Sequence, residues 1–97
     1  MDFLDTTYDA IIGLAYPTMS DVGLPIFDMM MEQQLLEKNI FSFYMAMNKK
    51  DSSELLFGSF DENKIVGNIS WHPVIDQLFW SLKLDDIKYN GKNLNIC

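Results

Sequence analysis

The chain has 97 residues, of which 48% are hydrophobic and 22% are charged, and its formal net charge is −7. This composition indicates one small globular domain and excludes a disordered chain. Every basic residue is lysine and no basic patch occurs, so we expect neither nucleic acid nor an anionic membrane as a partner. No apolar run has transmembrane length, and no basic region followed by an apolar one opens the sequence, so these residues predict no membrane span and no signal peptide.

The first predicted element is a strand at residues 8–17, with the sequence Tyr-Asp-Ala-Ile-Ile-Gly-Leu-Ala-Tyr-Pro. Its apolar run is typical of a strand that is buried on both faces. Gly13 interrupts the run and indicates a bulge or a close approach of another backbone segment. Pro17 cannot donate a hydrogen bond to a neighbouring strand, so we expect the strand to end there.

A loop with turn-forming residues is predicted at 18–23, and a helix should follow it. Pro25 suits the first turn of that helix, and Asp28 favours the positive end of the helix dipole. Apolar residues at helical spacing continue to Leu35, and we expect the helix to end at 38–39.

The rest of the chain predicts strands, because apolar and polar residues alternate or apolar residues cluster between turns. A charged turn at 48–53 separates the first two, a polar link covers 61–64, and Asn90-Gly91 is a strong hairpin signal. The expected strands are 40–47, 54–60, 65–73 and 79–89.

The sequence offers no set of residues for metal or nucleophilic chemistry. His72 is the single histidine, so neither a Ser-His pair nor a zinc site is supported by any motif. Asp61 and Glu62 could bind a cation, but two carboxylates without further ligands are more typical of a solvated turn. We expect no cofactor. Asn68-Ile69-Ser70 is a glycosylation sequon, usable only in a chain that enters the secretory pathway.

Six motifs carry a resemblance to pepsin-like aspartic proteases. Residues 8–17 resemble the family's Phe-Asp-Gly-Ile-Leu-Gly-Leu-Ala-Tyr-Pro, with Ala10 in place of a glycine, and residues 39–44 are similar to Asn-Ile-Phe-Ser-Phe-Tyr of its cathepsin D-like members. Similar matches, in the same order and at nearly the same spacing, occur at 24–28 (Pro-Val-Phe-Asp), 56–61 (Phe-Gly-Gly-x-Asp), 71–74 (Trp-Val-Pro-Val) and 79–80 (Tyr-Trp).

The resemblance implies a mainly β structure with one short helix, as part of a bilobal acid protease fold. Residues 1–62 would form the C-terminal part of the N-terminal lobe, and residues 63–97 the interlobe sheet and the start of the C-terminal lobe. The family cleaves peptides with two Asp-Thr-Gly or Asp-Ser-Gly loops, whose carboxylates share a proton and activate a water. This sequence contains neither loop, since Asp5-Thr6-Thr7 lacks the glycine. We therefore expect the central part of an aspartic endopeptidase, with no catalytic residue of its own and inactive by itself.

The resemblance also implies roles for single residues. Phe3, Tyr8 and Ile11 would line the S1 and S3 subsites, although each could instead be core, and Phe79 would lie near the primed-side subsites. Gly13 would pack beneath the first catalytic loop, and Trp80 would belong to the core. A further implication concerns Cys97, the single cysteine, which would pair with a cysteine beyond this chain's end.

The implied partners are a peptide substrate with hydrophobic residues beside the scissile bond and the rest of the protease chain. The implied location is the secretory pathway, with a lysosomal, vacuolar or extracellular destination. Two other functions remain open. One is an inactive pepsin-like protein that binds peptides, and the other is a small independent β-rich interaction module, which would expose unpaired strand edges.

Overall fold

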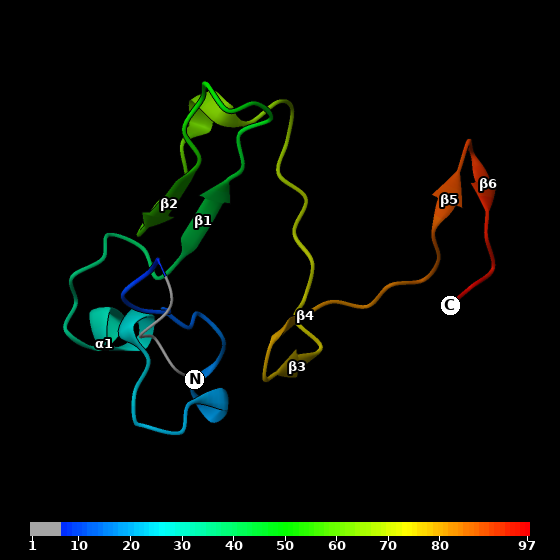
Figure 1. Cartoon of the computed structure of the whole chain (residues 1–97). Coiled ribbons are helices and arrows are strands. Elements are labelled where there is room, and N and C mark those ends of the chain that lie inside the picture. Colours follow the sequence, from blue (N-terminus) through cyan, green and yellow to red (C-terminus); the bar gives the residue numbers. More distant parts are fainter. Residues whose placement is uncertain (1–6) are drawn as a thin grey trace.

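The computed structural model describes residues 7–97. Within these residues the chain forms one short helix and three separate antiparallel hairpins of two strands each (Figure 1). This is the mainly β arrangement with a single short helix that the sequence predicts. The elements are the 3-10 helices η1 (Pro17–Met19) and η2 (Glu62–Lys64), the helix α1 (Ile26–Glu32), and the strands β1 (Phe41–Tyr44), β2 (Glu54–Phe57), β3 (Asp76–Gln77), β4 (Trp80–Ser81), β5 (Lys88–Tyr89) and β6 (Lys92–Asn93).

Residues 8–17 form an irregular segment, so the predicted strand is wrong. A strand needs at least one neighbouring strand for its backbone hydrogen bonds, and no strand of the described chain pairs with this segment. Ile11 and Ile12 are consequently 60% and 61% exposed. Pro17 begins η1 instead of ending a strand.

Helix α1 begins directly after Pro25, as predicted, but it ends at Glu32 and not near residue 38. The chain leaves the helix through Gln34, whose φ of 55° lies in the left-handed region. The amide of Leu35 then donates to the Met30 carbonyl at 3.0 Å, and the amide of Gln34 donates to the Met31 carbonyl at 3.1 Å. These two bonds form a Schellman motif, which satisfies helix-end carbonyls and stops the helix early.

Strands β1 and β2 confirm the predicted pair at 40–47 and 54–60, in shorter form. Phe41 pairs with Phe57 and Tyr44 pairs with Glu54 in an antiparallel register. In the predicted turn, the Asn48 side-chain oxygen accepts hydrogen bonds from the amides of Lys50 and Asp51. Local side-chain bonding of this kind fixes the turn and therefore the register of the hairpin.

The core of the described chain is a small aromatic cluster between α1 and the β1–β2 hairpin. Phe27, from α1, is the buried hydrophobic side chain of the described residues, at 6% exposure. Its ring centroid lies 4.9 Å from that of Phe41 in an edge-to-face arrangement and 6.1 Å from that of Phe57. This geometry is favourable for aromatic pairs and holds the helix against the hairpin.

The second half of the chain departs from the prediction in two places. Residues 65–73 form no strand, and the predicted strand 79–89 is divided into β4 and β5 with irregular chain between them. Strand-like sequence stays irregular where no partner strand is available for its backbone groups. The hairpin prediction at Asn90-Gly91 is confirmed, because both residues have positive φ, at 53° and 77°, in the tight turn between β5 and β6.

The chain exposes far more surface than a compact domain of its size. Its accessible surface is 8922 Å², whereas a folded monomer of this mass exposes roughly 5,700 Å². Its radius of gyration is 17.2 Å, against about 12 to 13 Å for a compact chain of this length. The apolar faces of the hairpins are therefore largely uncovered. In the described part of the chain, no helix is long and apolar enough to cross a membrane.

Candidate functional site

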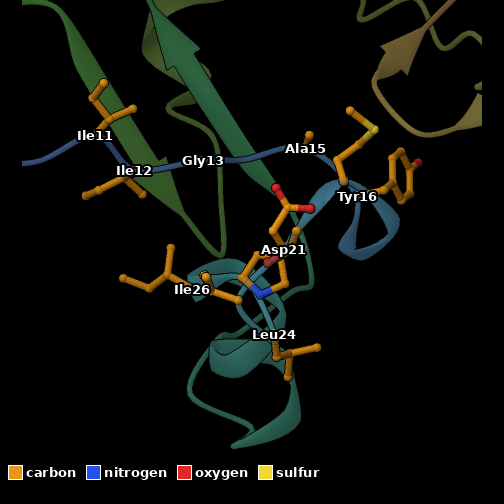
Figure 2. A pocket seen from close by; sticks show the side chains of 12 residues that line it. Ile11, Ile12, Gly13, Ala15, Tyr16, Asp21, Leu24 and Ile26 are labelled. Atoms are coloured by element: carbon orange, nitrogen blue, oxygen red, sulfur yellow. The ribbon is translucent and has the colours of Figure 1, made fainter. Parts of the chain in front are cut away.

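A groove of about 540 Å³ lies between the segment 11–16 and the loop that leads into α1 (Figure 2). One wall comes from the segment that contains Gly13, and the other comes from η1, residues 20–25 and the first residue of α1. The lining is mainly apolar and includes Ile11, Ile12, Met19, Val22, Leu24 and Ile26. In Figure 2, Ile11 and Ile12 point to opposite sides of their segment. This lining suits apolar side chains of a bound peptide.

The polar groups of the groove are few. Asp21 contributes a carboxylate, and the Ser20 hydroxyl donates to the Gly23 carbonyl oxygen. A carboxylate pair that shares one proton needs two close carboxyl groups, and Asp21 supplies one. Among residues 7–97, no three His, Cys, Asp or Glu side chains lie together in a way that could hold a metal ion. The groove therefore suits apolar side chains, but it does not contain the two carboxylates of a catalytic dyad.

The groove segment is attached to the β3–β4 hairpin by three hydrogen bonds. The Tyr16 amide donates to the Leu78 carbonyl oxygen at 3.1 Å, and the Thr18 hydroxyl donates to the Gln77 carbonyl oxygen at 2.8 Å. The indole N–H of Trp80 donates to the Leu14 carbonyl oxygen at 2.7 Å. We call these contacts between residues 14–18 and residues 77–80 the hairpin dock. It joins parts of the chain that are about sixty residues apart in sequence.

The predicted substrate-binding residues are not all in one place. Ile11 lies in the groove lining, and Tyr8, 44% exposed, lies just before it in sequence. Phe79 occupies the turn of the β3–β4 hairpin and is 59% exposed, outside the groove lining. Phe3 falls outside the described residues. The structure therefore brings Ile11 to the groove and leaves Phe79 on the neighbouring hairpin.

The predicted structural residues behave differently from each other. A Cβ placed on Gly13 would meet no heavy atom within 4 Å among the described residues, so nothing in this part of the chain requires a glycine there. Trp80 is 49% exposed, yet its ring centroid lies 4.7 Å from Tyr16 and 5.2 Å from Phe41. Trp80 therefore connects the groove segment to the aromatic cluster.

The second wall of the groove, formed by Met19, Leu24 and Ile26, was not predicted from the sequence. An apolar residue on each side of Pro25 is the signal that could have revealed it, because a proline at a helix start fixes the direction of the flanking residues. Asn68 and Cys97 are both exposed, and Cys97 is a free thiol.

One carboxyl group has a shifted pKa. The Asp86 carboxylate accepts hydrogen bonds from the amides of Ile87 at 2.8 Å, Asn95 at 3.1 Å and Ile96 at 3.4 Å. The bond from Ile87, followed by those from Asn95 and Ile96, lowers the pKa of Asp86 below its ordinary value, while desolvation works in the opposite direction. This carboxylate closes the base of the β5–β6 hairpin and lies outside the groove lining.

An apolar groove on a mainly β chain, with the sequence motifs described above, fits the class of peptide-binding proteases. The sequence profile of the eukaryotic aspartyl protease family matches residues 1–97, and the chain belongs to that family. Over 93 residues it is 41% identical to cathepsin E-B of Xenopus laevis, covering 93% of this chain and 23% of the relative. It is 41% identical to pepsin-2B of Gadus morhua over 86 residues, covering 88% of this chain and 26% of the relative. Pepsin A of Bos taurus is 35% identical over 88 residues, which cover 90% of this chain and 24% of the relative.

The chain thus spans about a quarter of the length of the curated relatives it matches. These relatives are cathepsin E and pepsins, and they give no support to the finer expectation of a cathepsin D-like member.

Proposed function

We propose that these residues form part of an aspartic endopeptidase and contribute one wall of its peptide-binding cleft. Membership of the eukaryotic aspartyl protease family over residues 1–97 is the observation that carries the proposal. The names cathepsin E and pepsin among its relatives support the same activity. Catalysis would use an aspartate dyad supplied outside these residues, because the sequence contains neither Asp-Thr-Gly nor Asp-Ser-Gly.

In this proposal residues 1–62 complete the N-terminal lobe, and residues 63–97 provide interlobe sheet and the start of the C-terminal lobe. The hairpin dock then crosses the boundary between the two, since residues 14–18 lie on one side and residues 77–80 on the other. A cleft between lobes needs such a contact, because its two walls must keep a fixed separation.

Substrate would bind with bulky apolar side chains next to the scissile bond. Ile11 supports this, because it is exposed in an apolar groove where a substrate side chain can displace water. Burying one such side chain contributes about 1.5 to 3 kcal/mol. We propose that Tyr8 and Phe3 serve the S1 and S3 subsites together with Ile11, and that Phe79 serves the primed side.

The same proposal places the protein in the secretory pathway, with a lysosomal, vacuolar or extracellular destination. Asn68 would then be available for glycosylation, and its exposure supports access by the glycosylation machinery. The exposed thiol of Cys97 is available for a disulfide with a residue outside this chain. A peptide substrate and the remainder of the protease are the expected partners, while the net charge of −7 disfavours nucleic acid and anionic membranes.

The test begins with the complete coding sequence that contains this segment. We expect an Asp-Thr-Gly before it and an Asp-Thr-Gly or Asp-Ser-Gly after it, and acid-dependent cleavage of a hydrophobic peptide that pepstatin inhibits. Flanks in which those aspartates are replaced, with peptide binding but no cleavage, would establish an inactive peptide-binding protein instead. Native termini at residues 1 and 97 would favour a small interaction module.

A further inference from the structure

The turn of the β3–β4 hairpin is held from both sides of Phe79. Gln77 and Leu78 precede Phe79, and their carbonyl oxygens accept hydrogen bonds from Thr18 and Tyr16. Trp80 follows Phe79, and its indole N–H donates to Leu14 at 2.7 Å. Phe79 itself remains 59% exposed. Its backbone is therefore restrained while its side chain stays accessible.

The segment that holds this turn also lines the groove. Ala15 and Tyr16 belong to the groove lining, and Tyr16 itself donates one of the dock hydrogen bonds, while Ala15 lies directly between it and Leu14. A shift of the dock would thus move the groove wall and Phe79 relative to each other.

Trp80 makes the most extensive contact in the dock. It donates the hydrogen bond to Leu14, and its ring centroid lies 4.7 Å from that of Tyr16 and 5.2 Å from that of Phe41, which it contacts edge-to-face. The Phe41 ring in turn contacts the ring of the buried Phe27 of α1. Trp80 therefore connects the turn both to the groove segment and to the aromatic core.

We propose that Trp80 is a positioning residue, which sets where Phe79 stands relative to the groove wall and so tunes recognition of an apolar side chain on the primed side of the substrate. The effect on recognition rests on the proposed function, whereas the restraint on the turn is a property of the chain itself.

The test uses the complete protein that contains these residues and two independent readouts. Trp80→Phe keeps an aromatic ring and removes the N–H donor. Hydrogen–deuterium exchange of residues 14–18 should become about 5-fold faster, as expected for the loss of one hydrogen bond. KM should rise by a similar factor for peptides with a bulky apolar primed-side residue, with kcat within about twofold of the parent value.

Two variants serve as comparison. Trp71→Phe is the matched control, because Trp71 is 76% exposed, and both readouts should stay at the parent values. Thr18→Val removes the hydroxyl that donates to Gln77 and leaves Trp80 in place, so it should accelerate exchange in the same segment. It keeps the test decisive if Trp80→Phe fails to fold.

Unchanged exchange and unchanged KM in both Trp80→Phe and Thr18→Val would overturn the proposal. A fall in kcat with equal KM for all substrates would also overturn it, because it would indicate a general structural role. A protein that cleaves no peptide would refute the proposed function alone, and the exchange measurement would still decide whether Trp80 restrains the turn.

Discussion

Gln34 shows how one residue sets the length of α1. It has a φ of 55°, a conformation that costs an L-residue with a Cβ roughly 1 kcal/mol and costs glycine almost nothing. We expect Gln34→Gly to stabilise the folded chain by less than that amount, because glycine also adds chain entropy to the unfolded state; the measurement is a shift of the urea denaturation midpoint.

Gln33→Gly is the control for this prediction. Gln33 has a φ of −82°, which suits any L-residue, so glycine should only add chain entropy to the unfolded state. An equal gain in both variants would contradict the proposed role of the left-handed conformation.

Ile11 lends itself to an equally direct comparison at the level of one side chain. Ile11→Ala removes part of the groove lining, and we expect kcat/KM of the complete protease to fall about 5- to 10-fold for substrates with a bulky apolar residue. Ile75→Ala is the matched control, since Ile75 has nearly the same exposure, 61% against 60%, and lies outside the groove lining. A similar fall in both variants would show that the effect does not arise in the groove.

Among the elements, the β5–β6 hairpin depends on one ionised side chain. Asp86 accepts three amide hydrogen bonds, and the pKa of its carboxyl group is lowered from 3.8. A carboxyl group whose pKa is lower in the folded state stabilises the fold at every pH above its unfolded-state pKa. This stabilisation is lost as the pH falls through the folded-state pKa. We therefore expect the protection of the Ile87 and Asn95 amides, measured by NMR relative to the intrinsic exchange rate at each pH, to fall below about pH 4.

Asp86→Asn should give low protection of the same amides at every pH, because the neutral amide is a weaker acceptor. Asp85→Asn serves as the control. The Asp85 carboxylate makes an exposed ion pair with Lys83 at 3.5 Å, which contributes little. A pH profile that persists in Asp86→Asn would assign the transition to another group.

The hairpins at 41–57 and 88–93 and the start of α1 were predictable, because local signals specify them: turn residues such as Asn90-Gly91 and a proline at the helix start. The irregular structure at 8–17 and 65–73, where strands were expected, could not be predicted, because strand formation depends on partner strands that composition does not reveal. Ile11 could be placed in the site from its motif, whereas the link between Trp80 and Leu14 spans 66 residues and leaves no periodic signal.

For the molecule as a whole, the main feature is its large accessible surface area. The accessible area exceeds that of a compact monomer by roughly 3,200 Å², which is more than a standard protein–protein interface buries in total. We expect the 97-residue chain on its own to bind the apolar dye ANS strongly and to self-associate at micromolar concentration, measured by fluorescence and analytical ultracentrifugation.

Phe43→Lys should lower both dye binding and self-association. Phe43 is 59% exposed on β1, and a lysine on a strand with one unpaired edge discourages pairing with another chain. Lysine in place of Val66, an exposed residue of the irregular segment 65–73, should have a smaller effect. A monomeric wild-type chain that does not bind the dye would show that its apolar faces are covered in another way.

The hairpin dock has a consequence for the order in which the chain folds. The β1–β2 and β5–β6 hairpins close short loops and should form within microseconds. Closing the 66-residue interval between Leu14 and Trp80 costs on the order of 4 kcal/mol of chain entropy. Three hydrogen bonds and one aromatic contact return about the same amount. The dock should therefore form last during folding and open first during unfolding, so the two halves of the chain meet only after each has acquired its own local structure.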